Sequence, residues 1–178
     1  MSRQITSTAK GGMNRMKRYL AYGSNLNIPQ MLRRCPDARV IGTAVIPGYR
    51  LLFKGSRTGS YLTIEPAKGY SVPVAVWEVS DADEAALDRY EGFPVFYYKT
   101  EMILPIRGIR SGKVRTRSAF IYIMHENRPF GIPSPAYVRT CRQGYHAFGF
   151  DDDLLDDAIV FSADNAMEEA ETVYEEDW

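Results

Sequence analysis

The stretch "YLAYGSNLN", Tyr19 to Asn27, decides how the rest of this sequence is interpreted. The run "RYLAY" lacks an alternation of apolar and polar residues, which is typical of a strand buried on both faces. It ends at Gly23, Ser24 and Asn25. Gly23 permits a sharp turn, and the amides that follow can form a nest that binds a carboxylate or stabilises a developing oxyanion. A Gly-Ser-Asn turn is also a common plain loop, so a second feature is needed before the stretch indicates a function.

Strands and short helices are predicted on both sides of this turn. "NIPQMLRRCP", 27–36, predicts a helix capped by Asn27, and "SDADEAALDRYEG", 80–92, predicts one that Ser80 caps and Gly92 ends. Strands are expected at 38–46, 49–55, 61–66, 72–80, 96–106 and 117–124, punctuated by Pro47-Gly48, Gly55, Gly69 and a turn around Gly108–Arg115. A helix over 133–150 has a buried stripe of Tyr137, Cys141 and Tyr145, and a last short helix covers 151–161.

Length and composition indicate one soluble domain. The 178 residues are 45% hydrophobic and 25% charged, and no internal repeat or linker divides them. No apolar run approaches the roughly 20 residues that span a bilayer, and "MSRQITSTAKGG" lacks the apolar region of a secretory signal, so we expect a cytoplasmic protein. We predict a disordered segment at 1–16, a domain at 17–162 and an acidic tail at 163–178, and Met16 is a second candidate for the natural start.

A net charge of zero hides an asymmetry along the chain. Residues 1–18 hold five Lys/Arg and no acid, whereas 151–178 hold twelve Asp/Glu and no base. The body, 19–150, therefore has 17 basic and 10 acidic residues. Without a Lys/Arg run or a recognition-helix pattern we expect no nucleic-acid partner. The basic body favours a surface neutralised in part by the acidic tail, or the steering of small anionic substrates.

The second informative segment is "LDRYEGFPVFYY", Leu87 to Tyr98. Glu91 is at the C-terminal end of a predicted helix, the unfavourable end for an anion. Its neighbours in sequence are aromatic, and a carboxyl among aromatic rings loses solvation, which raises its pKa towards the range of a general acid/base. The alternative is an exposed glutamate at a helix end.

Taken together, the two segments resemble the γ-glutamylcyclotransferase family, including the AIG2-like proteins. "YLAYGSN" follows a first strand, "LDRYEG" comes later in the chain and "YYKTEM" follows it. The resemblance continues through "AFIYIM" and "PSPAYVRTCRQGYHAFGF" and covers about Tyr19 to Phe150.

The resemblance implies an α+β fold, a small mixed β-barrel flanked by helices. It implies an enzyme that cyclises a γ-glutamyl group to 5-oxoproline and releases a free amine, with no cofactor, no metal and no membrane. Glu91 takes the place of the catalytic acid/base. The substrate-binding residues that it implies are Tyr19, Leu20, Ala21, Tyr22, Gly23, Ser24, Asn25, Tyr98 and Tyr137. The oligomeric state, monomer or homodimer, stays open.

Other readings of the residues are kept beside this one. Cys141 with His146, or Cys35 with His125, would be a cysteine nucleophile, although Cys141 lies on the apolar stripe of its helix. No His/Cys/Asp cluster has metal-ligand spacing. Within the same fold, the protein could instead act on γ-glutamylamines, remove γ-glutamyl groups in one biosynthetic pathway, or bind a small molecule without catalysis.

Overall fold

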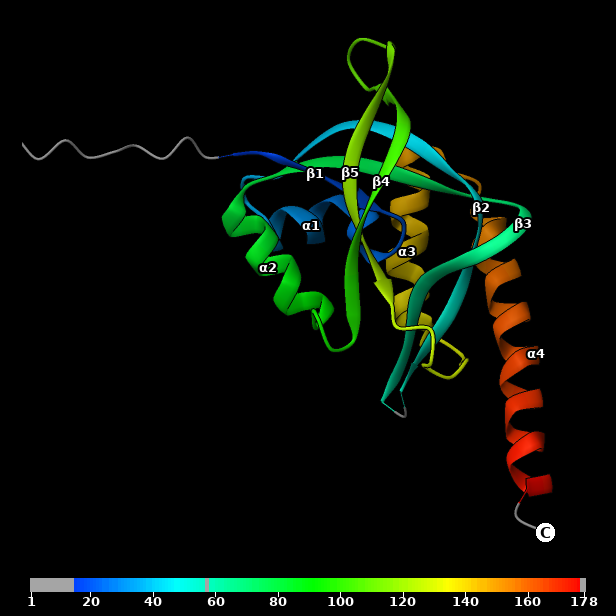
Figure 1. Cartoon of the computed structure of the whole chain (residues 1–178). Helices are drawn as coiled ribbons and strands as arrows, with labels where there is room; N and C mark the ends of the chain where they lie inside the picture. The colour runs from blue at the N-terminus through cyan, green and yellow to red at the C-terminus, as the bar shows by residue number, and fades with distance from the viewer. Residues whose placement is uncertain (1–14, 57, 177–178) are drawn as a thin grey trace, which may run out of the picture.

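Five strands close into a barrel in the order β1-β3-β2-β4-β5, in a computed structural model that describes residues 15–56 and 58–176 (Figure 1). The strands are β1 (Lys17–Ala21), β2 (Arg39–Ser56), β3 (Gly59–Val79), β4 (Tyr97–Gly108) and β5 (Val114–Met124). β1 pairs antiparallel with β3 and parallel with β5, so the barrel is mixed. The expected α+β barrel is thus confirmed. The segment predicted to be disordered, 1–16, lies outside the described residues apart from Arg15 and Met16.

β1 is the buried strand that the unalternating "RYLAY" predicts. Leu20 and Ala21, whose side chains point to opposite faces, are 0% and 1% exposed. A short strand paired on both sides, with both faces covered, places its last residue at a defined depth in the barrel. The Gly23–Asn25 turn therefore begins inside the molecule and not on its surface.

Four of the predicted strands prove to be two long ones. The runs 38–46 and 49–55 belong to β2, apart from Ala38, which precedes it, and 61–66 and 72–80 belong to β3, apart from Ser80, which caps the next helix. The pairing shifts between Pro47 and Tyr49, where Gly48 and Gly69 have positive φ angles of 74° and 87°. The Pro-Gly and Gly signals mark an irregularity at which two continuous strands bend, instead of loops between separate strands.

The helices are η1 (Ser24–Leu26), α1 (Ile28–Arg34), α2 (Asp81–Glu91), α3 (Pro135–Phe148) and α4 (Asp153–Glu176). Their predicted caps are confirmed. The Asn27 side chain accepts from the Gln30 N–H, and Ser80 and Asp83 form a reciprocal capping box. Gly92, with φ of 64°, ends α2 directly after Glu91. These local contacts are the reason that the helix boundaries follow from the sequence.

The last helix is longer than predicted. The short helix expected at 151–161 is α4, which continues to Glu176, so the predicted tail boundary at 163 lies inside one helix. Residues 162–171 are rich in alanine and glutamate, which are strong helix formers. Hydrogen bonds join the helix to β2 and to the segment after β5: Ser162 Oγ accepts from the Phe53 N–H at 2.8 Å, and Glu169 Oε2 accepts from the Phe130 N–H at 3.1 Å. In Figure 1 its C-terminal half extends away from the barrel.

α3 packs against the turn that follows β1. Its Gly144 lies so close to Leu26 that an added Cβ would be 2.5 Å from the Leu26 Cβ, which leaves no room for a larger residue. Tyr145, 0% exposed, donates from its hydroxyl to the Tyr22 carbonyl at 3.1 Å. The predicted stripe on α3 is thus buried at Cys141 and Tyr145, and it holds the Tyr22–Leu26 segment in place.

Both cysteines are buried in the core. Burial raises the pKa of the Cys35 and Cys141 thiols to about 12, so neither is a thiolate at neutral pH. His146 Nε2 lies 3.0 Å from Asp152 Oδ2 on the surface. The cysteine-nucleophile alternative has no support from this arrangement. None of the described helices has the length and apolar character needed to cross a membrane.

Candidate active site

Glu91 and Asn25 meet although 66 residues separate them in the sequence. Glu91 is the last residue of α2, and Asn25 lies in the turn after β1. Asn25 Nδ2 donates a hydrogen bond to Glu91 Oε1 at 2.9 Å. The two segments that the sequence singles out therefore form one site.

Asn25 is held by partners on both ends of its amide. Its Nδ2 also contacts the Tyr19 hydroxyl at 2.9 Å, and Arg34 Nη1 donates to its Oδ1. The Arg34 guanidinium in turn lies 3.3 Å from the centre of the Tyr90 ring. Because Oδ1 accepts from a cation, the NH₂ group is the end that faces Glu91.

The Glu91 carboxyl is poised to exchange a proton near neutral pH. Burial raises its pKa from 4.5 to about 7, while the Arg34 charge and the Asn25 hydrogen bond act in the opposite direction. Loss of solvation is the dominant effect because it penalises the ionised form directly. At pH 7 both protonation states are populated, as acid/base catalysis requires.

Two adjoining cavities meet at Glu91. The outer cavity, about 460 Å³, lies between the end of α2 and the β2–β3 turn, and the inner recess, about 20 Å³, lies against the Gly23–Asn25 turn. The cavities share four lining residues, namely Ser24, Glu91, Tyr97 and Tyr137. The outer volume is within the range of small-molecule sites. Among the described lining residues, Glu91 is the only carboxylate, and none is histidine or cysteine.

Tyrosine hydroxyls surround the recess and stay neutral. Tyr97 donates to the Leu62 carbonyl at 2.8 Å, and the Tyr137 hydroxyl accepts from the Leu62 N–H at 3.1 Å. Tyr22 donates to the Tyr122 carbonyl at 2.7 Å. Burial raises the pKa of Tyr22, Tyr97 and Tyr137 well above the usual value. Apart from Glu91, the described polar side chains that line the recess are therefore uncharged.

Most predicted site residues line these cavities. They are Tyr19, Tyr22, Gly23, Ser24, Asn25, Glu91 and Tyr137. Leu20 and Ala21 line neither cavity and belong to the buried core of β1. Their contribution is to fix the depth at which the turn begins.

The structure places Tyr98, which we predicted to bind the substrate, outside the candidate site. Its hydroxyl donates to Glu126, its ring packs on His125 with centroids 5.3 Å apart, and it lines neither cavity. The neighbouring Tyr97, which we did not predict, points inward because successive strand residues face opposite sides. In "FYYKT" the two tyrosines are indistinguishable without the register of β4.

Other members of the site were also missed. Arg34, Tyr61, Leu62 and Tyr122 contact or line it from α1, β3 and β5. Arg34 comes at the end of a short helix whose basic residues look like ordinary C-terminal charges. Only the packing of α1 beside α2 places it next to Asn25.

Gly23 does not serve a left-handed backbone conformation, because its φ is −121°. A Cβ at this position would make ordinary contacts, 3.4 Å from the Tyr137 hydroxyl and 3.5 Å from the Leu62 Cβ, but it would project from a residue that lines the recess. The N–H groups of Leu26 and Asn27 donate within the turn, each at 3.0 Å. Among the described hydrogen bonds in turns, loops and caps, none is donated by the N–H of Gly23, Ser24 or Asn25.

Known proteins resemble this chain in sequence and in fold. The family described as "Gamma-glutamyl cyclotransferase, AIG2-like" matches residues 19–139. The gamma-glutamylcyclotransferase of Bos taurus is 30% identical over 136 residues, with 71% of this chain and 68% of that protein covered. The Homo sapiens protein of the same name is 28% identical over 134 residues, with the same shares of the two chains covered.

Solved structures share the fold. A structure titled gamma-glutamyl cyclotransferase superposes with a TM-score of 0.70 at 24% identity, covering 81% of this chain and 86% of that one. A yeast protein whose title calls it specific to glutathione gives 0.54 at 12% identity, covering 86% and 97%. The chain therefore belongs to the AIG2-like gamma-glutamyl cyclotransferase family and is a cyclotransferase.

Proposed function

We propose that the protein cyclises γ-glutamyl amides to 5-oxoproline, with Glu91 as the general acid/base. The observation that carries this is the position of Glu91: a carboxyl with a pKa of about 7 at the junction of the two cavities. Asn25 holds the carboxyl from one side, which leaves the cavity side for a substrate.

The reaction needs one proton to move twice. The substrate's α-amino nitrogen loses a proton to the Glu91 carboxylate and attacks its own γ-carbonyl carbon. The tetrahedral intermediate then collapses, the bond to the leaving nitrogen breaks, and Glu91 returns the proton to that nitrogen. Atoms and charge balance without a co-reactant, so the step needs neither a metal nor a cofactor.

The turn after β1 supplies the remaining catalytic effect in this proposal. The Gly23–Asn25 amides, which donate to no described backbone acceptor, are available to the glutamyl carboxylate or to the oxygen as it gains charge. Ring closure is intramolecular, so a recess that keeps the glutamyl chain folded contributes a large part of the acceleration. The neutral tyrosines around the recess exclude water without adding a competing charge.

The outer cavity favours a leaving group that carries a carboxylate. Arg89 and Arg128 line it, and Glu91 is the only described acid there. Arg128 is held with its guanidinium carbon 4.5 Å from the Phe96 ring centre. We infer that γ-glutamyl amino acids or peptides, with glutathione among them, fit better than γ-glutamylamines, whose leaving group has no carboxylate.

Turnover of a panel of γ-glutamyl substrates tests both the cyclisation and the preference for a leaving group with a carboxylate. The full chain is incubated with γ-glutamyl-alanine, glutathione and γ-glutamyl-ethylamine, and 5-oxoproline is measured. We expect turnover of the carboxylate-bearing substrates and a loss of about 10²- to 10⁴-fold in kcat for Glu91→Gln. Arg128→Gln should raise KM for γ-glutamyl-alanine only, with Arg139→Gln on the exposed face of α3 as the matched control.

Two results would contradict the proposal. Wild-type turnover by Glu91→Gln would remove Glu91 from the mechanism. Binding of the panel without 5-oxoproline from any member would favour the non-catalytic alternative. Equal KM changes for both leaving groups in Arg128→Gln would leave the cyclisation intact but reject the specificity inference.

A further inference from the structure

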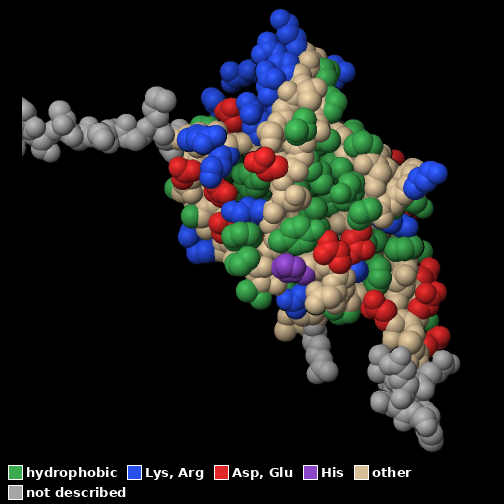
Figure 2. All heavy atoms as spheres, viewed as in Figure 1, with side chains coloured by type: hydrophobic (Ala, Val, Ile, Leu, Met, Phe, Trp, Pro, Cys, Tyr) green, Lys and Arg blue, Asp and Glu red, His purple; other side chains and the backbone are tan. Residues whose placement is uncertain are grey.

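A third cavity lies at the other end of β4 from the Glu91 site. It has a volume of about 540 Å³ and shares no described lining residue with the two cavities at Glu91. Its walls are the outer ends of β1, β2 and β3 on one side and the β4–β5 hairpin on the other. In Figure 2 Lys and Arg side chains gather at the tip of this hairpin.

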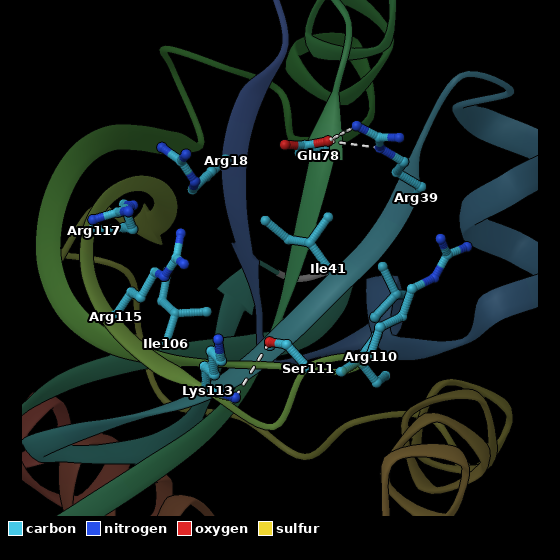
Figure 3. A pocket seen from close by; sticks show the side chains of 13 residues that line it. Arg18, Arg39, Ile41, Glu78, Ile106, Arg110, Ser111, Lys113, Arg115 and Arg117 are labelled. Atoms are coloured by element: carbon cyan, nitrogen blue, oxygen red, sulfur yellow. Dashed lines mark hydrogen bonds and ion pairs between the residues drawn. The ribbon is translucent and has the colours of Figure 1, made fainter.

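The lining of this cavity is strongly basic. It contains six cations and a single described acid, and the cations are Arg18, Arg39, Arg110, Lys113, Arg115 and Arg117. The acid, Glu78, is paired with Arg39, whose Nη2 lies 2.5 Å from its carboxylate. Among the described residues none of the other five cations forms an ion pair. Figure 3 shows Arg18, Lys113, Arg115 and Arg117 on one side of the space and Arg110 on the other.

Strand pairing forces part of this concentration. Arg18 on β1 and Arg39 on β2 are both register partners of Glu78 on β3, so the pairing brings two arginines and one glutamate to the same end of the sheet. On β5, Arg115 and Arg117 share a face because they are two residues apart. Like charges gathered around one cavity repel one another, and an anion in the cavity relieves that repulsion.

The chemistry of the lining favours phosphate. Five of the six cations are arginines, whose planar guanidinium groups bind phosphate oxygens bidentately. The apolar part of the lining is formed by Val40, Ile41 and Ile106, which are buried or half-buried, and by the exposed Ile109. An apolar lining lowers the local dielectric and strengthens each charge–charge contact beside it.

We propose that this basic cleft binds a small ligand that carries two or more phosphate groups. The volume is within the range of small-molecule sites, and five cations without a described carboxylate partner exceed what one phosphate needs. The cleft has no aromatic residue among its described lining, so the bases of a single-stranded nucleic acid would find no side chain to stack on. The proposal is independent of the function proposed for the Glu91 site.

Calorimetry with inorganic phosphates tests the proposal on the full chain. Orthophosphate, pyrophosphate and tripolyphosphate are titrated at low ionic strength, and ATP is added as a probe with an organic part. We expect one site per chain and an affinity that rises with the number of phosphate groups and falls with added salt.

Variants locate the site. Arg115 and Arg18 form no described side-chain hydrogen bond or ion pair, so Arg115→Ala and Arg18→Ala should keep the fold, which thermal melts would verify. Each should weaken tripolyphosphate binding about tenfold, the effect of removing one charge-assisted contact. Arg139→Ala, an exposed arginine on α3 outside the cleft, is the control and should bind like the wild type.

Three outcomes would overturn the proposal. The first is no measurable binding of tripolyphosphate or ATP. The second is an equal loss in Arg139→Ala, which would indicate nonspecific charge attraction. The third is tighter binding of a single-stranded or duplex oligonucleotide that tripolyphosphate fails to displace, because the surface would then recognise nucleic acid.

Discussion

Asn25 Nδ2 donates to Glu91 Oε1 at 2.9 Å, and this hydrogen bond joins the turn after the first strand to the end of α2. It favours the ionised carboxyl, while burial favours the protonated one. The balance keeps the pKa of Glu91 at about 7 and makes its protonation sensitive to each neighbour. The first two predictions follow from that balance.

Glu91→Gln should stabilise the protein at alkaline pH. The folded wild type holds a proton that the unfolded chain loses above pH 4.5, so its stability falls as the pH rises from 4.5 to about 7. Glutamine has no such proton. Denaturant melts should show the variant more stable by roughly 1 to 3 kcal/mol at about pH 8, with the difference vanishing towards about pH 4. A pH-independent difference would show that burial does not raise the carboxyl's pKa.

Arg34→Gln should move the acidic limb of the pH–rate profile to higher pH. The Arg34 charge lowers the pKa of Glu91, so its removal raises that pKa, and the carboxylate that accepts the substrate proton appears only at higher pH. Glutamine keeps a donor for Asn25 Oδ1. Arg33→Gln, an exposed neighbour on α1, is the control. If the acidic limb of the profile does not move in Arg34→Gln, a group other than Glu91 determines its position.

Gly23→Ala should impair substrate binding far more than Ser24→Ala. The added methyl would lie 3.4 Å from the Tyr137 hydroxyl, inside a recess of about 20 Å³. The φ of −121° is not left-handed, but the ψ of −132° lies outside the regions that alanine favours, so the stability cost should be about 1 kcal/mol or somewhat more. Ser24 loses only its contact with the Tyr90 hydroxyl at 3.0 Å. Steady-state kinetics on folded variants decide this, and loss of activity in Ser24→Ala alone would assign the role to the serine hydroxyl.

Tyr97→Phe and Tyr98→Phe should behave differently. Tyr97 lines the recess and donates to the Leu62 carbonyl, so its variant should lose about 1 kcal/mol of stability and change KM. The Tyr98 hydroxyl contacts Glu126 outside the cavities, so its variant should keep the wild-type kcat/KM. The reverse pattern would restore Tyr98 as the pocket tyrosine. Parallel kinetics and melts of the two variants provide the comparison.

A chain shortened to Lys17–Ala163 should fold with a small drop in melting temperature. It keeps the Ser162 contact with Phe53 and loses the Glu169 contact with Phe130, worth about 1 kcal/mol. From Met167 to Thr172 the described side chains of α4 are exposed. A failure to fold would show that residues outside 17–163 are needed for the fold of the domain.

The sequence by itself determined the features that rest on neighbours along the chain. The helix caps at Asn27, Ser80 and Gly92 are satisfied within four residues, so local chemistry predicts them. The burial of β1 follows from its unbroken apolar run. The pairing of the Gly23–Asn25 turn with Glu91 came from the order of two motifs and the family that they resemble.

Tertiary structure alone decided what depends on register and on packing between distant segments. The register of β4 decides that Tyr97, and not Tyr98, faces the recess, because a shift of one residue reverses which side chains point inward. The packing of helices placed Arg34 on Asn25, and curved strands turned predicted loops at Pro47-Gly48 into bends. The basic cleft likewise has no sequence signature, since its cations come from three strands and the turn of the hairpin, and only the closed barrel brings them to one cavity.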